Sequence, residues 1–361
     1  MKFFVLPLLV LSNFLFSGER LQHPTGPLPY HTEEVSFENG EISLAGTLTL
    51  PKGKNAFPTV LLIAGAGPSD RNQFGYGHKT FLVLADHLAQ CGIASLRFDK
   101  RGVGDSTGEY HLATSGDFAS DALSGIEYLK TLKQVHNIGV VGHSEGGAIA
   151  AVVAAESEDV AFVVSMAGPA VSGEKLLYEQ GLILQKAVGI DQKRIKEDRK
   201  LRQKVFAIIK KEDNFQEIEK NIRKVVGKHF AKSSSHAKTT AAEGIAVLHP
   251  SNIEELLTRI VSPWFRYFLT FDSSKYLKQV QVPILALGAE KDLQVPPHQN
   301  IPAVEKALKS AKHTNFTIKV LPNLNHMFQT CQTGAISEYS SIEETIAPTA
   351  LHTISDWILE R

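Results

Sequence analysis

The hydrophobic and polar positions divide the chain into an alternating part and a helical part. Short apolar runs, typical of strands covered on both faces, occur at residues 59–64, 93–98, 138–141, 160–166, 284–287 and 317–321. Apolar positions at helical spacing separate these runs, at 79–91, 117–133, 145–156, 299–311 and 346–359. Strands that alternate with helices indicate a mostly parallel sheet with right-handed crossovers, so the chain is predicted to have an α/β fold.

Two segments depart from this alternation. Polar and apolar positions alternate at residues 35–37 and 42–44 around Asn39-Gly40, which predicts an antiparallel hairpin. Residues 173–279 contain no strand-like run. Instead, 195–211 and 215–226 have amphipathic helical spacing, and 232–240 have the composition of an exposed loop. We predict a helical insertion over 173–279, with a core around the sheet formed by residues 33–172 and 280–361.

The N-terminus has the pattern of a secretory signal. Met1-Lys2 is followed by an apolar stretch that ends at Phe16 and by the small pair Ser17-Gly18. This stretch is shorter than the roughly 20 residues that span a bilayer. We predict a cleaved signal peptide over residues 1–18 and a proline-containing linker over 19–32, so the mature chain is expected to be secreted (periplasmic or extracellular). An uncleaved anchor or an apolar strand are the alternatives.

Composition and charge narrow the function classes. The chain has 361 residues, of which 43% are hydrophobic and 21% charged, as in soluble globular proteins. Its 38 basic and 38 acidic residues balance, so nucleic acid is not an expected partner. Beyond the signal no stretch has transmembrane length, so stable membrane insertion is not expected after cleavage. Cys91 and Cys331 have no zinc-ligand spacing and are predicted to be free thiols on opposite sheet edges.

A candidate nucleophile lies between a predicted strand and a predicted helix. Gly142-His143-Ser144-Glu145-Gly146-Gly147 contains the pattern G-x-S-x-G. A serine on such a tight strand-to-helix turn needs small neighbours, which the glycines supply. Its hydroxyl becomes a nucleophile once a base takes its proton. The alternative is a glycine-rich turn whose serine has no chemical role.

A base and an acid are expected later in the chain, in the order acid then base. His326 follows the last predicted strand, and Asp292 lies in the loop after the strand at 284–287. Because parallel strands have their carboxyl ends at one edge of a sheet, Ser144, Asp292 and His326 can meet there. Glu290 is the alternative acid. The other histidines weighed as the base, or as pocket residues, are His78, His111, His143, His298 and His313.

A tetrahedral intermediate needs two backbone N–H donors that are already in place. Glu145, which follows the candidate nucleophile, is expected to supply one. The second is expected from Ala66, in the loop Ala64-Gly65-Ala66-Gly67 after the first buried strand. The charged residues around this loop are predicted to brace it as ion pairs rather than to bind substrate: Asp70, Arg71, Asp99, Lys100 and Arg101.

These motifs together resemble those of lid-containing α/β-hydrolases of the serine carboxylesterase and serine aminopeptidase-like group. The matching segments are residues 64–72, 98–106, 142–147 and 288–297, and residues 262–268 resemble the return helix of the lid in a subgroup of small-ester carboxylesterases. The resemblance covers 33–361. It implies the α/β-hydrolase fold, a lid at 173–279, a Ser144–His326–Asp292 triad, and ester hydrolysis without cofactor or metal. Ala64 stands where many members have histidine.

The sequence therefore predicts a secreted serine carboxylesterase whose partner is a small-molecule ester. Small to medium acyl groups are expected, because the insertion lacks the long apolar face of a lipase. The aromatic positions 264, 265, 267, 268 and 271 are expected mostly in the core of the insertion, with one or two in an acyl pocket. The alternatives are a peptidase of the same fold, a thioesterase or acyltransferase, and a non-catalytic binding protein. Substrate-binding residues and oligomeric state are left open.

Overall fold

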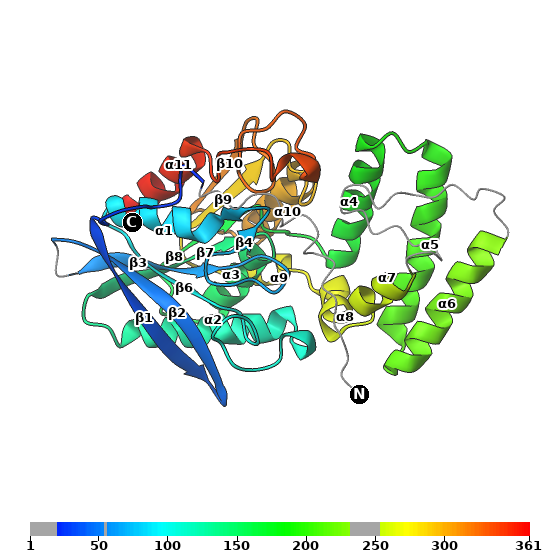
Figure 1. Cartoon of the computed structure of the whole chain (residues 1–361), viewed down its shortest axis with the longest axis horizontal. Coiled ribbons are helices and arrows are strands. Elements are labelled where there is room, and N and C mark those ends of the chain that lie inside the picture. The colour runs from blue at the N-terminus through cyan, green and yellow to red at the C-terminus, as the bar shows by residue number, and fades with distance from the viewer. Residues whose placement is uncertain (1–19, 54–55, 232–252) are drawn as a thin grey trace.

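The computed structural model describes residues 20–53, 56–231 and 253–361, so the predicted signal peptide (1–18) and the whole of the predicted loop at 232–240 lie outside the described residues. An eight-stranded sheet in the order β1-β2-β6-β3-β7-β8-β9-β10 forms its centre (Figure 1). The strands are β1 (Tyr30–Asn39), β2 (Ile42–Pro51), β3 (Phe57–Ile63), β6 (Ala94–Phe98), β7 (Val135–His143), β8 (Phe162–Met166), β9 (Ile284–Ala289) and β10 (Phe316–Leu321). β1 and β2 form the predicted antiparallel hairpin, and the strands from β6 to β10 are parallel.

Helices cover both faces of the sheet (Figure 1). One apolar layer contains α1 (Thr80–Gln90) and α11 (Pro348–Leu359). The other contains α2 (Ser115–Lys130), α3 (Glu145–Glu156), α9 (Ser274–Leu277) and α10 (Pro297–Ser310). Because both faces are buried, the inner parallel strands β3, β8 and β9 are mostly apolar, which is the pattern found in the sequence. The predicted α/β architecture is confirmed.

Five helices between β8 and β9 form a lobe beside the sheet (Figure 1). They are α4 (Gly173–Ala187), α5 (Gln192–Lys211), α6 (Phe215–Ala231), α7 (Ile253–Ile260) and α8 (Pro263–Thr270), called the helical segment below. Apolar residues at helical spacing give this segment a core of its own, which includes Val205, Phe206, Ile222 and Leu257. The last helix of the predicted insertion, α9, packs elsewhere, because Leu277 is buried in the apolar layer of α2 and α3.

Part of the predicted linker at 19–32 is packed on the core. β1 already begins at Tyr30. Arg20 is only 6% exposed and donates to the backbone oxygens of Ser340 at 2.6 Å and Ile342 at 3.1 Å. The side chain of Gln22 bonds the backbone of Ile346 at both its N–H and its carbonyl. The prolines predicted a linker here. The structure instead shows Arg20 and Gln22 bonded to a segment more than 300 residues away in the chain.

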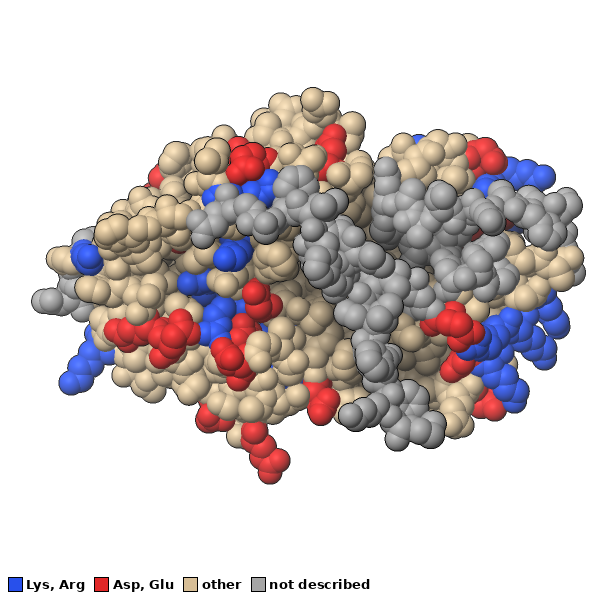
Figure 2. Space-filling model, in the orientation of Figure 1, with Lys and Arg blue, Asp and Glu red and all other residues tan. Residues whose placement is uncertain are grey.

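Charges of both signs lie side by side on the surface. Figure 2 shows Lys and Arg side chains beside Asp and Glu side chains at the end of the molecule formed by α5 and α6. Arg223, for example, pairs with Glu219 and with Glu254. Both cysteines are free thiols, as predicted. Within the described ranges, every helix is too short or too polar to cross a membrane.

Candidate active site

The residues predicted to meet at one edge of the sheet do so. Ser144 directly follows β7, Asp292 follows β9 and His326 follows β10. Because these strands are parallel, their carboxyl ends lie at the same edge, although His326 is 182 residues from Ser144 in the chain.

Ser144 lies in a strained turn between β7 and α3. Its φ of 56° is in the left-handed region, which non-glycine residues rarely adopt. Strand and helix approach so closely that a Cβ at Gly142 would collide with the backbone of Gly146, and one at Gly146 would collide with the backbone of Ile63. The glycines of the motif are thus required by close backbone packing, and the turn projects the serine hydroxyl from the sheet edge.

Three side chains form a continuous hydrogen-bonded chain at this edge. His326 Nε2 lies 3.0 Å from Ser144 Oγ, and His326 Nδ1 lies 2.7 Å from Asp292 Oδ2. The other oxygen of Asp292 accepts the N–H groups of Gln294 and Val295 at 2.7 and 2.9 Å. Since Asp292 can only accept as a carboxylate, Nδ1 carries the proton and Nε2 is left to accept the serine proton.

The alternative acid, Glu290, points elsewhere. Its side chain is at the surface, where it accepts the N–H of Asn323 at 2.8 Å. Asp292, in contrast, is 3% exposed. The structure therefore brings Asp292, and not Glu290, against His326.

The two residues predicted to supply the oxyanion donors lie beside the candidate nucleophile. Ala66 and Glu145 line a cavity together with Ser144. Glu145 is the first residue of α3, where N–H groups have no acceptor within the helix. Gly65, next to Ala66, approaches Ser144 so closely that a Cβ there would lie 3.2 Å from the serine Cβ. The arrangement can place two donors on the oxygen of a carbonyl that Ser144 attacks.

His143, which the sequence analysis left without a role, links the two sides of the site. Its Nε2 lies 2.8 Å from the carbonyl oxygen of His326, which can only accept, so Nε2 carries the proton. Its Nδ1 then accepts from the amide of Gln73 at 2.8 Å, and Gln73 Oε1 accepts the N–H of Gly65 at 3.2 Å. Burial, followed by the neighbouring His326, lowers the pKa of His143 to about 3, so this chain of bonds contains a neutral imidazole.

A buried ion pair lies beside the loop Ala64-Gly65-Ala66-Gly67, called the oxyanion loop below after its predicted role. Lys100 Nζ donates to the carbonyl of Gly65 at 2.6 Å and lies 3.4 Å from Glu145 Oε2. Glu145 Oε1 accepts from Ser115 Oγ and from Trp264 Nε1, each at 2.6 Å. Burial lowers the pKa of Lys100, and the charge of Glu145 opposes this shift. Both side chains are almost fully buried, so each depends on the other for its charge to be tolerated.

The predicted ion-pair network around the loop is only partly present. Arg71 pairs with Asp99 at 2.6 Å, and its backbone N–H donates to the same carboxylate. Asp70 instead accepts backbone N–H groups within its own loop. Arg101 turns away and pairs with Asp121 of α2 at 2.6 Å. Adjacent charged residues in a loop point in different directions, which residue spacing alone does not reveal.

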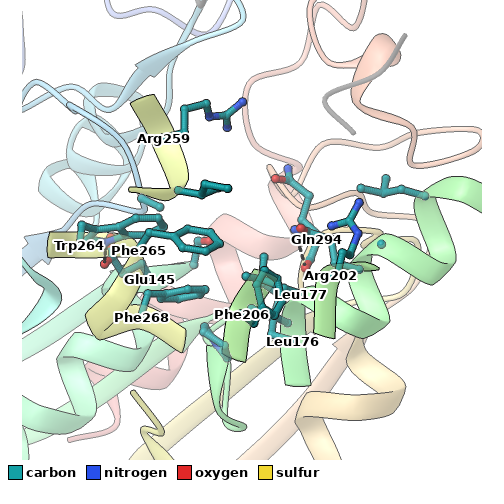
Figure 3. Close-up of a pocket in the computed structure, with 18 of the residues that line it drawn as sticks. Glu145, Leu176, Leu177, Arg202, Phe206, Arg259, Trp264, Phe265, Phe268 and Gln294 are labelled. Atoms are coloured by element: carbon teal, nitrogen blue, oxygen red, sulfur yellow. Dashed lines mark hydrogen bonds between the residues drawn. The ribbon is translucent and has the colours of Figure 1, made fainter. Parts of the chain in front are cut away.

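An apolar cavity of about 270 Å³ opens from Ser144 towards the helical segment. Figure 3 shows the aromatic side chains of α8 on one side, with Leu176 and Leu177 of α4 and Phe206 of α5 across from them. Three of the five predicted aromatic positions line it, namely Trp264, Phe265 and Phe268, more than the one or two expected. Tyr267 and Phe271 pack on the core instead. Polar groups at the rim are Gln180, Arg202, Arg259 and Gln294.

The other four histidines weighed from the sequence lie away from the cavity. His78 is fully buried against Thr345 and the carbonyl of Tyr339, and His111 is exposed, so neither lines the pocket as the sequence had suggested. His298 faces solvent beside Glu179, as expected, whereas His313 is half-buried on the carbonyl of Val282. Within the described part of the chain, no three His, Cys, Asp or Glu side chains are grouped as ligands for a metal ion.

Comparisons with known proteins agree with this fold. The family described as "Serine aminopeptidase, S33" matches residues 76–243, which include Ser144 but neither Asp292 nor His326. Esterase EstD of Thermotoga maritima is 34% identical over 161 residues, or 44% of this chain. That match spans 39% of the length of the relative.

Solved structures show the same architecture over most of the chain. Est1E from Butyrivibrio proteoclasticus, solved with ferulic acid bound, has a TM-score of 0.52 and 15% identity, covering 90% of this chain and 98% of its own. The 2,6-dihydroxy-pseudo-oxynicotine hydrolase has a TM-score of 0.50 and 15% identity, covering 92% and 68%. At this identity the likeness shows the fold.

Proposed function

We propose that this chain is an α/β-hydrolase that hydrolyses carboxylic esters through an acyl-enzyme on Ser144. One observation carries the proposal. Ser144, His326 and Asp292 are linked by hydrogen bonds, and Ser144 lines a mostly apolar cavity that Ala66 and Glu145 also line. These are the parts that acyl transfer needs: a nucleophile, an oriented base and two donors for an oxyanion.

In the proposed mechanism, Ser144 Oγ forms a bond to the acyl carbon while its proton passes to His326 Nε2. The carbonyl oxygen takes up the negative charge and is stabilised by the two N–H groups. Asp292 stabilises the imidazolium and keeps it oriented. The bond to the alcohol oxygen then breaks, and His326 returns the proton to the leaving alcohol. Water, activated by the same histidine, releases the acid from the acyl-enzyme.

The cavity supports small to medium acyl groups. Its volume of about 270 Å³ lies near the lower end of small-molecule pockets. Its walls beside Ser144 are apolar, contributed by α4, α5 and α8. We therefore propose that the helical segment acts as the lid that sets acyl-chain length.

The polar groups of the cavity favour an ester over an N-terminal peptide substrate. An aminopeptidase needs an acidic group for the substrate amine. Among the described residues that line the cavity, Glu145 is the single carboxylate, and it already receives Lys100, Ser115 and Trp264. A peptidase of this fold is thus the weaker candidate.

Export of the chain is a separate proposal, which rests on the charge and apolar pattern of residues 1–18. The buried Arg20 supports it, because the folded body is anchored from the second residue after the predicted signal. N-terminal sequencing of protein recovered outside the cytoplasm should begin close to residue 19. Recovery of the intact chain from the cytosol would contradict export and leave the esterase proposal unaffected.

The esterase proposal is tested with p-nitrophenyl esters from acetate to decanoate, together with aminoacyl p-nitroanilides. The expected result is an optimum at short to medium acyl esters, lost by many orders of magnitude in Ser144→Ala. Ser157→Ala, at the other end of α3, is the matched control and should keep full activity. Cleavage of the anilides alone would favour the peptidase. Equal activity of Ser144→Ala and the wild type would remove Ser144 from the mechanism.

A further inference from the structure

The peptide unit between Gly65 and Ala66 is held by a buried lysine that does not line the cavity. Lys100 Nζ donates to its carbonyl oxygen, on Gly65, at 2.6 Å. The N–H of the same peptide belongs to Ala66, which lines the cavity beside Ser144. In a trans peptide the C=O and N–H bonds point in opposite directions. A donor that fixes the carbonyl therefore also fixes the direction of the N–H.

Lys100 has no other evident task at the site. Its side chain is 5% exposed and is absent from the cavity wall, so it does not reach a bound ester. Its ammonium group lies 3.4 Å from Glu145 Oε2 and 4.3 Å from the ring centroid of Phe118. Burying a charged group this deeply costs desolvation free energy, and this one lies next to both predicted oxyanion donors.

From this geometry we infer that Lys100 is a positioning residue for the oxyanion hole, an inference that rests on the proposed function. Lys100 aims the N–H of Ala66 at the developing oxyanion through the carbonyl of Gly65. Glu145 supplies the second N–H from its backbone and holds Lys100 with its carboxylate. A hydrogen bond to a carbonyl also polarises the amide, which makes its N–H a stronger donor.

The Lys100 hydrogen bond should stabilise the transition state and leave substrate binding unchanged. Preorganised donors lower the barrier because they need no reorganisation when charge develops. Loss of the Lys100 bond frees the Gly65–Ala66 peptide to rotate, while the apolar cavity stays intact. A lysine with a purely structural role would instead change the fraction of folded protein and leave each folded site equally active.

The test compares Lys100→Met, the double variant Lys100→Met/Glu145→Gln and the control Arg101→Met. Methionine keeps the apolar stem and removes the charge and the donor. The double variant also avoids a buried unpaired carboxylate, so it remains informative if the single variant does not fold. Arg101 is the neighbouring residue and loses a comparable buried ion pair, with Asp121, that does not touch the oxyanion loop.

Active sites are first counted by titration with a fluorophosphonate that labels Ser144. Per titrated site, both Lys100 variants should lose about 10- to 100-fold in kcat on p-nitrophenyl butyrate, with KM changed less than about threefold. The inhibition constant of an alkyl boronic acid, which forms a tetrahedral adduct with the serine, should rise by a similar factor. Arg101→Met should lower Tm and keep kcat within about twofold of the wild type.

Wild-type kcat in the double variant would overturn the inference. So would a change in KM alone, or a decrease only in the number of titrated sites. Either result leaves the esterase proposal standing, because the wild type and Ser144→Ala decide that question. If the wild type cleaves no ester, the rate of fluorophosphonate labelling still tests Lys100, since that reaction also develops charge on an oxygen in the oxyanion hole. An unchanged labelling rate in the Lys100 variants would then refute the positioning role.

Discussion

The carboxyl edge of the sheet and the helical segment are stabilised in different ways. At the sheet edge, buried polar groups are linked by directional bonds, as in the chain from Gly65 through Gln73 and His143 to His326. The helical segment is held by apolar side chains such as Val205 and Ile222, with ion pairs near its surface. Hydrogen bonds depend on angle and distance, whereas apolar burial does not. Reaction rate should therefore depend on the sheet edge, and substrate size on the helical segment.

The largest effect is expected at the acid of the triad. Asp292→Asn removes the charge that orients His326 and stabilises its protonated form, so kcat should fall about 10⁴-fold with little change in KM. Stopped assays with p-nitrophenyl butyrate, corrected for titrated sites, measure this. Glu290→Gln, two residues away on the same loop, is the control and should stay within about threefold of the wild type. A comparable loss in Glu290→Gln would reverse the assignment of the acid.

The next effect concerns the pH dependence of stability, which should reveal the neutral His143 at the sheet edge. Its pKa lies at about 3 in the folded chain against 6.5 ordinarily, so below pH 6.5 the unfolded chain binds a proton that the folded chain does not. The free energy of unfolding should thus fall as pH drops, by roughly 2 to 3 kcal/mol between pH 7 and pH 4.5 from this group alone.

His143→Gln keeps one donor and one acceptor but cannot titrate. Urea unfolding at pH 7, 5.5 and 4.5 should therefore show a shallower pH dependence in this variant than in the wild type, even if its stability at pH 7 is lower. Parallel pH profiles of the two proteins would show that folding does not lower the pKa of His143, and would contradict the neutral imidazole.

A smaller and more selective effect is expected from the helical segment. Leu177→Trp places a larger side chain in the cavity wall and shortens the space for the acyl chain. The value of kcat/KM for p-nitrophenyl decanoate should therefore fall at least about 10-fold, while that for acetate changes little. Leu182→Trp is the matched control, because Leu182 lies on the same helix α4 but does not line the cavity beside Ser144. Equal losses for acetate and decanoate would mean that the helical segment affects the reaction itself.

Much of the site followed from patterns that are local in the chain. The turn around Ser144 requires glycine, and the run of apolar strands requires a parallel sheet, so the meeting of Ser144, Asp292 and His326 could be predicted. The roles of Gln73 and His143 could not, because their partners lie in other loops. The available signal was a histidine directly beside the candidate nucleophile, and this does not reveal what its ring contacts.

The sequence by itself determined the alternation of strands and helices, the strained turn and the candidate nucleophile, because periodicity and backbone sterics act between near neighbours. Only the tertiary structure decided which buried polar side chain bonds to which backbone or side-chain group at the site. Lys100 meets Gly65 from 35 residues away, and Trp264 meets Glu145 from 119 residues away. The physical reason is that buried polar groups need hydrogen-bond partners, and close packing brings those partners from segments that are distant in the sequence.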